Sequence, residues 1–465
     1  MPQRREHYDA LVIGAGQGGI PLAEAFADAG WKTALVERAY VGGSCINYGC
    51  TPTKTMMGSA DAAHWARRAA DYGVHIDPPN VDLGVVRERK RKIVNSFRTK
   101  NREHLESLDG LDLIGGDAAF AGERTVDVRL KNGVNVPLEA DTIIIDTGSR
   151  PAIPPISGID RVPTLDSTSI LEVADIPNHL AILGAGYVGV EFAQMFRRFG
   201  GTVSLIEQAD HILPQEDANI AGTLQEILCS EGVTVRTGFT ATYLEDADGH
   251  IRILGAEGER GLVVVCTDVL VALGRAPNTE RLNLIVAGIE TTDRGHIVVD
   301  EHLQTSVPDI YAIGDVNGGD PFTHISYDDY RILRTNLIDG GSASTENRIL
   351  SYVVYTDPQL GRVGLSEDQA RERGVDYRLA AIPMSHVARA LETDRAQGML
   401  KALVDPKTDR ILGAEILGPE GGEIMSMLHI AMLADLPFTR LRDAPFAHPT
   451  YAEALNSLFA SWSDS

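Results

Sequence analysis

Two stretches of the chain share one pattern of apolar and polar positions. The apolar run Ala10–Ile13 leads into a glycine-rich turn, an amphipathic helical segment (PLAEAFADAG) and a second apolar run, TALVE, that ends on an acid. The same order returns as LAIL, a second glycine-rich turn, VEFAQMFRRFG and TVSLIE. An apolar strand, a helix and a second apolar strand predict a βαβ unit on a parallel sheet. The sequence therefore predicts an α/β protein with two such units.

The glycine spacing predicts that both units bind dinucleotides. Each turn reads Gly-x-Gly-x-x-Gly, and the second turn follows the first by 170 positions (184 − 14). Such glycines let the backbone approach a diphosphate at the helix N-terminus, and the acid about 20 residues on accepts ribose hydroxyls. The expected contacts are Gly14, Gly16, Gly19 and Glu37 in the first unit, and Gly184, Gly186, Gly189 and Glu207 in the second.

Glu207 indicates which coenzyme binds to the second unit. A carboxylate at this strand end suits the free 2′-hydroxyl of NAD and repels a 2′-phosphate, which usually needs an Arg. No Arg follows Glu207 in QADHILPQED. We therefore expect NADH to be preferred over NADPH.

Two cysteines, Cys45 and Cys50, lie in GGSCINYGCTPTK after the first unit. The segment that follows has helical composition, with Thr51 expected as its N-cap, so Cys50 is expected at a helix N-terminus, where a thiolate is stabilised. Lys54 adds positive charge one turn later. A zinc site would need two further nearby ligands, and a static disulfide is unusual in the cytoplasm, so a redox-active pair is the favoured interpretation. Cys229 and Cys266 are expected to be small buried apolar residues.

Composition narrows the choice of partners. The 465 residues carry a formal net charge of −23, which argues against nucleic acid and anionic membranes. The basic stretch Arg87–Lys100 is expected to be a solvated helix face. Neither a signal peptide nor a run of about 20 apolar residues is visible, and four cysteines do not make a disulfide scaffold. We therefore expect a cytoplasmic protein.

At this point the chain resembles, over its full length, the class I pyridine nucleotide-disulfide oxidoreductases, the family of dihydrolipoamide dehydrogenase, glutathione reductase and mercuric reductase. The motifs that carry the resemblance are the two glycine-rich turns, GGSCINYGCTPTK, VALGRAPNTERL, TSVPDIYAIGDV and FAHPTYAEAL. CINYGCTPTKTM and THISYDDYRI look closest to sequences similar to mercuric reductase. The resemblance implies FAD on the first unit and NAD on the second.

The resemblance also implies residue roles. Cys50 would lie against the flavin as a thiolate, and Cys45 would be the thiol that meets the substrate. A carboxylate that fixes the tautomer of a histidine makes it a better acid and base, which thiol–disulfide exchange needs. The remaining roles are Lys54 paired with Glu191 near the flavin, Asp315 on the FAD ribityl chain, Tyr187 over the nicotinamide pocket, Gly148 and Gly274 beside the cofactors, and His448 oriented by Glu453 as acid and base.

Two features depart from the resemblance. Mercuric reductases carry a C-terminal cysteine pair, whereas no cysteine follows Cys266 in this chain. This speaks against mercuric ion as the main substrate. In IIIDTGSRP, Asp146 stands where relatives usually have Ala or Asn, and nothing in the sequence explains an acid at this position.

The expected fold class is α/β, with two Rossmann-like dinucleotide-binding domains and a C-terminal α+β dimerisation domain. Residues 1–150 and 275–347 would form the FAD domain, 151–274 the NAD domain, and 348–465 the dimerisation domain of a homodimer. In the last of these, Ser366 and Gln369 fit a capping box, with Gly374 as the helix stop.

The leading functional hypothesis is an enzyme that passes hydride from NAD(P)H through FAD to the Cys45–Cys50 disulfide and then to a disulfide substrate, or runs in reverse with a dithiol. No metal site is expected in the protein itself. One alternative is a reductase of mercury(II) or copper(II), since soft thiolates bind such ions. Another is a flavin-binding redox sensor without turnover.

Overall fold

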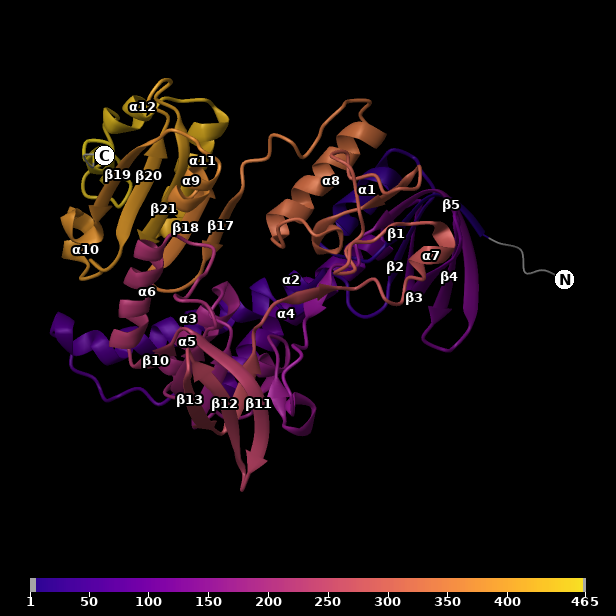
Figure 1. Ribbon diagram of the computed structural model, residues 1–465. Helices are drawn as coiled ribbons and strands as arrows, with labels where there is room; N and C mark the ends of the chain where they lie inside the picture. The colour runs from indigo at the N-terminus through magenta and orange to yellow at the C-terminus, as the bar shows by residue number, and fades with distance from the viewer. Residues whose placement is uncertain (1–5, 463–465) are drawn as a thin grey trace.

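The structure of the protein, a computed structural model, describes residues 6–462. Figure 1 shows three groups of strands, one near the N-terminus, one in the middle of the chain and one near the C-terminus. The helices α3 (Cys50–Arg68) and α5 (Tyr187–Phe199) lie between the second and third groups. No described helix is long and apolar enough to cross a bilayer.

The first sheet carries the first glycine-rich turn. Its strands are β1 (Glu6–Ile13), β2 (Thr33–Glu37), β3 (Leu111–Gly122), β4 (Thr125–Leu130), β5 (Asn135–Ile145) and β16 (Ile310–Ala312). β1 pairs in parallel with β2 and β5, while β3, β4 and β5 continue as an antiparallel layer. Apolar clusters cover both faces of the parallel part of the sheet, where β2 and the second half of β1 are continuous apolar runs. The accompanying helices are α1 (Gly19–Asp28), α2 (Gly43–Asn47), α4 (Leu83–Glu106), α7 (Leu284–Ala287) and α8 (Thr323–Leu337).

The second sheet repeats this architecture around the second turn. Its parallel strands are β7 (Thr164–Leu165), β8 (His179–Leu183), β9 (Thr202–Ile206), β10 (Val233–Arg236) and β14 (Asp268–Val271), with α5 and α6 (Ala218–Ser230). An antiparallel layer of β11 (Phe239–Ala247), β12 (His250–Glu257) and β13 (Arg260–Cys266) accompanies it. The short strands β6 (Ser149–Pro151) and β15 (Arg275–Pro277) pair where the chain crosses between the two sheets.

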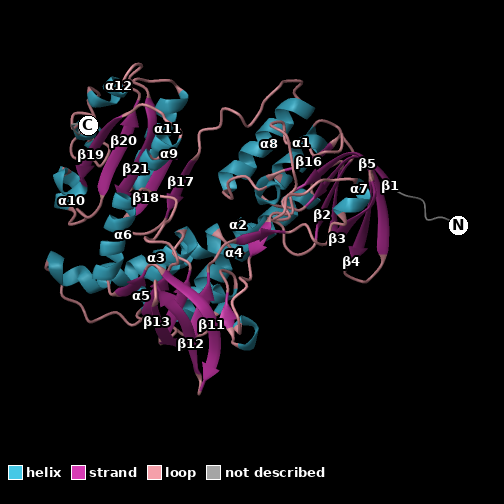
Figure 2. Cartoon of the chain, viewed as in Figure 1, coloured by secondary structure: helices cyan, strands magenta, loops and turns pink. Residues whose placement is uncertain are grey.

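The third sheet is antiparallel, which confirms the expected change of architecture. Its order is β17-β18-β21-β20-β19, and Figure 2 shows helices around it. The strands are β17 (Ser351–Val354), β18 (Gln359–Gly364), β19 (Arg378–Pro383), β20 (Met399–Val404) and β21 (Ile411–Gly418). The helices are α9 (Glu367–Glu372), α10 (Ala388–Glu392), α11 (Gly421–Leu433), α12 (Phe438–Arg442) and α13 (Ala454–Leu458). The expected capping box of Ser366 and Gln369 opens α9, and Gly374 follows with a φ of 64°.

Buried ion pairs join the second and third sheets. Lys401 of β20 is fully buried, pairs with Asp217 beside α6, and lies 2.8 Å from Glu367 and 3.7 Å from Glu415. Because a buried ammonium is stable only when it is paired, these contacts tie the C-terminal sheet to the second dinucleotide unit.

One expectation about a single side chain was wrong, and the expectation of a solvated basic helix held for most of its residues. Cys229 is exposed near the end of α6, whereas Cys266 is buried as expected. The basic stretch forms α4 with a largely solvated face, but the Lys90 side chain is buried and pairs with Glu172. Helical periodicity places a residue on a face and does not reveal an ion-pair partner in a distant segment.

Candidate functional site

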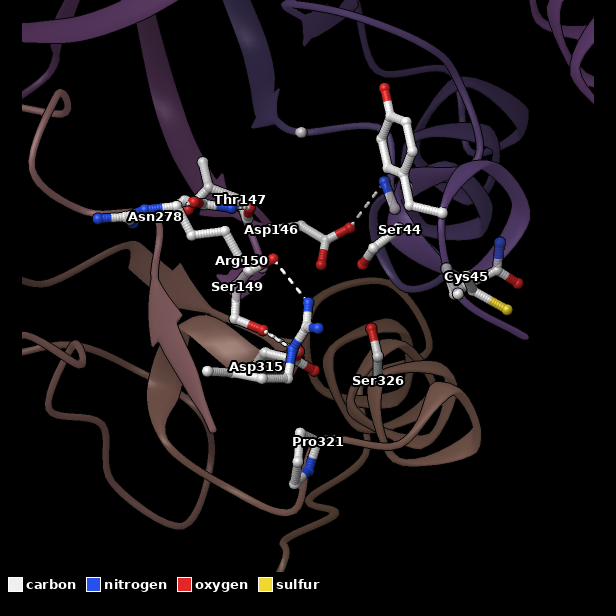
Figure 3. A pocket seen from close by; sticks show the side chains of 18 of the residues that line it. Ser44, Cys45, Asp146, Thr147, Ser149, Arg150, Asn278, Asp315, Pro321 and Ser326 are labelled. Carbon is white, nitrogen blue, oxygen red and sulfur yellow. Dashed lines mark hydrogen bonds and ion pairs between the residues drawn. The ribbon is translucent and has the colours of Figure 1, made fainter. Parts of the chain in front are cut away.

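A cavity of about 460 Å³ lies between the first unit and the N-terminus of α5. Figure 3 shows side chains from two stretches of the chain, 44–150 and 278–326, converging on one open space, with Asp146 in the middle. The candidate site residues that line it are Gly14, Gly16, Glu37, Cys45, Cys50, Lys54, Gly148, Tyr187, Glu191 and Asp315.

The first glycine-rich turn fits a diphosphate because it leaves no room for side chains. Gly14 has a φ of 107°, and a Cβ there would lie 2.2 Å from the carbonyl oxygen of Asp146. A Cβ at Gly19 would lie 2.4 Å from the Gly14 carbonyl oxygen. Glu37 ends β2 and accepts the N–H groups of Ala15 and Ala39 at 3.0 and 2.7 Å. The turn, helix N-terminus and acid therefore have the arrangement of a dinucleotide site.

The second turn has the same construction. A Cβ at Gly184 would lie 2.5 Å from the Ala272 carbonyl oxygen, and a Cβ at Gly189 would lie 1.9 Å from the Gly184 carbonyl oxygen. Gly186 is the N-cap residue of α5. Of the residues predicted for this unit, Tyr187 and Glu191 line the 460 Å³ cavity, and burial raises the pKa of Tyr187. The other predicted residues, Gly184, Gly186, Gly189, Glu207 and Gly274, lie outside it.

The two cysteines lie on consecutive helices at the cavity wall. Cys45 belongs to α2, and Cys50 is the first residue of α3, with Gly49 as N-cap. The helix thus begins before Thr51, so the expected Thr51 cap was wrong, while the position of Cys50 at the helix N-terminus is confirmed.

The electrostatics of the pair make Cys50 the thiolate. A hydrogen bond from the Cys45 thiol lowers the pKa of Cys50 to about 6, and Thr323 and Lys54 act in the same direction. The hydroxyl of Thr323 lies 3.4 Å from the Cys50 sulfur. The same hydrogen bond, together with burial, raises the pKa of Cys45, so Cys45 keeps the proton of the reduced pair. Thr323 begins the motif THISYDDYRI, but the sequence did not indicate its contact with Cys50, which lies 273 residues earlier.

Lys54 and Glu191 form an ion pair across the cavity wall. The Nζ of Lys54, one turn into α3, lies 2.5 Å from the Oε2 of Glu191 on α5. The backbone N–H of Tyr355 donates to the other carboxylate oxygen at 2.8 Å, and Lys54 lies over the Tyr355 ring at 4.6 Å. This pair joins both units and the C-terminal sheet, and Tyr355 is a third member that the motifs did not indicate.

Asp315 reaches the cavity from the segment after β16. The hydroxyl of Ser149 donates to its carboxylate, and the Arg275 Nε lies 3.5 Å from the same oxygen and 2.7 Å from the Ser149 oxygen. Gly148 lies beside Ser149 with a φ of 63°, and Gly274 precedes Arg275 with a φ of 114°. Both glycines occupy the crossover, and only Gly148 reaches the cavity.

His448 and Glu453 contact each other, and no hydrogen bond or ion pair among the described residues joins either of them to Cys45 or Cys50. The Nδ1 of His448 lies 2.9 and 3.0 Å from the two Glu453 oxygens, which fixes the ring and leaves Nε2 free to exchange protons. The histidine side chain is 66% exposed and neither residue lines the cavity. The C-terminal sheet stands apart from the first sheet in Figure 1.

Comparison with known proteins agrees with this geometry. Residues 8–334 match the family "Pyridine nucleotide-disulphide oxidoreductase", and residues 350–459 match its dimerisation domain. The chain is 40% identical to the probable pyridine nucleotide-disulfide oxidoreductase RclA of Escherichia coli, covering 97% of this chain and 99% of the relative. It is 34% identical to a mercuric reductase of Staphylococcus aureus, covering 96% and 81%. A solved structure, the Cu(II) complex of the HOCl-induced flavoprotein disulfide reductase RclA, superposes with a TM-score of 0.90 at 38% identity and covers 98% and 99%.

Proposed function

This chain belongs to the pyridine nucleotide-disulphide oxidoreductase family of NAD(P)H-dependent flavoproteins, and we propose that it uses Cys45 and Cys50 to reduce a disulfide substrate. The observation that carries the proposal is the asymmetry of the two thiols, with a Cys50 pKa of about 6 at a helix N-terminus. FAD, when bound, supplies the hydride acceptor between NAD(P)H and the cysteine pair.

Cys45 is the thiol that attacks. Its sulfur forms a mixed disulfide with one half of the substrate, and the other half leaves as a thiolate that takes up a proton. Cys50 then attacks the Cys45 sulfur, which closes the internal disulfide and releases the second product thiol. The low pKa of Cys50 keeps it ionised for this second step at neutral pH.

His448 and Glu453 supply the acid and base for the first step. Because Cys45 holds the proton of the reduced pair, its attack needs a base, and the leaving thiolate needs an acid. We place this pair at the cysteines of the partner subunit in a homodimer. The match to a dimerisation domain supports the dimer, as do Ile430 and Leu433, which expose 66% and 65% of their surface along α11.

We propose that the second unit prefers NADH. Glu207 is fixed by the N–H groups of Ala185 and Ala209 at 2.7 and 2.9 Å, so it cannot swing away from a 2′-phosphate. Lys54 and Glu191 would lie beside the reacting end of the flavin, and Asp315 would bind its ribityl chain. Tyr187 would cover the nicotinamide pocket.

The domain limits follow the same plan. We propose that residues 1–150 with 275–347, 151–274 and 348–465 form the FAD, NAD and dimerisation domains. A redox-active pair among only four cysteines suits a reducing compartment, and we propose the cytoplasm.

A second candidate function is reduction of a soft metal ion at the same cysteines. The Cu(II) complex of RclA and the mercuric reductases among the relatives favour it. Cys45 and Cys50 both line the cavity, and two neighbouring thiols can bind copper or mercury ions. The described residues hold no group of three or more His, Cys, Asp or Glu side chains able to bind a metal, so such an ion would enter as substrate.

A steady-state screen separates the two candidates. Purified holoenzyme would be assayed with NADH against low-molecular-weight disulfides, copper(II) and mercury(II). We expect turnover with at least one disulfide and its loss in Cys45→Ser. If no disulfide is reduced while copper(II) or mercury(II) is consumed in a Cys45-dependent manner, the metal-reductase function replaces the first proposal.

A further inference from the structure

Asp146 places a carboxyl group inside the first glycine-rich turn. It follows the last residue of β5, and its Oδ2 accepts the N–H groups of Gly16 and Gly19 at 3.0 and 2.8 Å. Only 6% of the residue is exposed. Because the N-terminus of α1 is where the FAD diphosphate binds, this acid stands beside the most negative part of the cofactor.

The second unit shows that the turn does not need this acid. IDTGSRP after β5 corresponds to VALGRAP after β14, so Ala272 occupies the position of Asp146. The backbones match: the Asp146 N–H donates to Ile13 O at 2.8 Å, and the Ala272 N–H donates to Leu183 O at 2.8 Å. The carboxyl group is therefore an addition to the FAD-binding turn, because the second unit forms the same turn with an alanine at this position.

The second oxygen of the carboxyl group is available to a ligand. In Figure 3 one oxygen of Asp146 makes the marked bond, and the other points into the open space of the cavity. Within residues 6–462, Oδ1 has no hydrogen-bond partner. A polar group that is more than nine-tenths buried and still has a free oxygen at a diphosphate site is placed to contact that diphosphate.

The charge of this carboxyl group decides whether the contact attracts or repels. Burial raises the pKa of Asp146 well above its ordinary value, and the nearby Asp315 and Asp329 act in the same direction, while the two N–H groups oppose them. The nearby cations pair with the other two acids and not with Asp146. Arg275 lies 3.5 Å from Asp315, and Arg348 lies 2.6 Å from Asp329. No described cation bonds to Asp146.

We propose that Asp146 positions the FAD diphosphate as a neutral carboxylic acid, with Oδ2 accepting from Gly16 and Gly19 and the Oδ1 hydroxyl donating to a phosphate oxygen. The protonated acid adds one side-chain hydrogen-bond donor for the diphosphate to a turn that otherwise contains only backbone groups. A diphosphate nearby disfavours ionisation further, so FAD binding and retention of this proton support each other.

The proposal gives FAD affinity a definite dependence on pH. Apoprotein with a protonated Asp146 binds FAD well, and ionised apoprotein must take up a proton before the same contact forms. Affinity is therefore constant at low pH and falls by about tenfold per pH unit above the pKa of the apoprotein acid. Asp146→Asn keeps an acceptor for the two N–H groups and a donor for the phosphate, and it cannot ionise.

The test measures FAD binding to apoprotein by flavin fluorescence over about pH 5 to 10, a range that brackets buried carboxyl groups. We expect the wild type to lose affinity at the alkaline end and Asp146→Asn to show a flat profile. Asp329→Asn is the matched control, since Asp329 is another buried acid with a raised pKa that bonds to Gly314 at 2.9 Å and not to the first turn. It should still lose affinity at the alkaline end, with the fall beginning at a somewhat lower pH, because the charge of Asp329 helps to raise the pKa of Asp146.

A second measurement covers the case in which Asp146→Asn does not fold. Infrared spectra of the wild-type holoprotein with ¹³C-labelled aspartate should show a protonated carboxyl band at neutral pH. That band should remain in Asp329→Asn. The proposal would be overturned if Asp146→Asn lost FAD affinity at alkaline pH as the wild type does. It would also be overturned if the wild-type holoprotein showed no protonated carboxyl band. Neither readout uses the disulfide or metal acceptor, so a failure here is distinct from a failure of the proposed function.

Discussion

Glu37 and Glu207 hold their glycine-rich turns in the same way. In each, one carboxylate oxygen accepts the N–H between the first two glycines, Ala15 at 3.0 Å and Ala185 at 2.7 Å. The other oxygen accepts the N–H two residues after the acid, Ala39 at 2.7 Å and Ala209 at 2.9 Å. Each acid is thus part of its turn before any ribose arrives, and the two units differ in what surrounds this shared arrangement.

The fixed position of Glu207 predicts coenzyme preference. The wild type should show a higher kcat/KM with NADH than with NADPH. Glu207→Gln should lower the ratio of these two kcat/KM values by about tenfold, because it removes the repulsion between the carboxylate and the 2′-phosphate of NADPH. Steady-state kinetics with both coenzymes measure this. Glu37→Gln is the matched control and should weaken FAD binding without changing the ratio. A wild type that prefers NADPH would contradict the assignment.

The unequal thiols predict different spectra for the two cysteine variants. In the two-electron-reduced protein, the Cys50 thiolate should give a long-wavelength absorbance with the flavin, which Cys50→Ser abolishes and Cys45→Ser retains. Because the pKa of Cys50 is lowered to about 6, the band should be present above pH 6 and lost as the pH falls through it. If both variants behave alike, the two thiols have been assigned wrongly.

The contact between His448 and Glu453 predicts which half-reaction becomes slower when the acid is removed. His448→Ala should slow disulfide reduction by about 10²–10⁴ and leave reduction of the flavin by NADH nearly unchanged, because only the thiol steps need this proton. Stopped-flow and steady-state rates separate the two halves. Glu453→Gln keeps the histidine and should cost less. An equal loss in both half-reactions would instead indicate damage to the fold.

Separation of His448 from the cysteines of its own chain predicts active sites shared between subunits. Inactive Cys45→Ser and His448→Ala chains, mixed and allowed to exchange, should recover about a quarter of the sites, because half of the dimers then contain one intact combination. Activity after exchange, verified by mass, measures this. Absence of recovery in verified mixed dimers would show that each chain completes its own site.

The buried position of Lys401 predicts a large effect on stability. Lys401→Met leaves the carboxylates of Asp217, Glu367 and Glu415 without their common cation and should lower the free energy of unfolding by about 3–5 kcal/mol. Denaturant unfolding measures the loss. Lys407→Met is the control, since Lys407 is exposed and its pair with Asp376 at 3.7 Å should contribute less than about 1 kcal/mol. Equal losses in both variants would refute the role of burial.

Features that depend on neighbouring residues could be predicted from the sequence. The two βαβ units, Cys50 at a helix N-terminus and the Ser366–Gln369 box each lie within a short window, where periodicity and capping act directly. Contacts made by distant segments could not be predicted. Thr323 reaches Cys50 from α8, and Asp146 reaches Gly16 and Gly19 because β5 lies beside β1. The sequence signal for Asp146 was its departure from the Ala or Asn that relatives usually have, and this signal did not indicate which groups the acid contacts. The prediction that Cys229 is buried was wrong, because helical spacing does not reveal which residues near the end of a helix are exposed to solvent.

The seam of buried charge between the second and third sheets has a consequence for recombination among relatives. Lys401 pairs with Asp217, and Arg362 lies 3.1 Å from Glu216, so each cation belongs to one sheet and its anion to a segment beside the other. A chimera that exchanges the C-terminal part alone would bring foreign side chains to two sites where an unpaired charge is costly. Chimeras that fold should therefore take residues 216–217, Arg362 and Lys401 from the same parent. The C-terminal part would then evolve together with the NAD unit and not as an independent module.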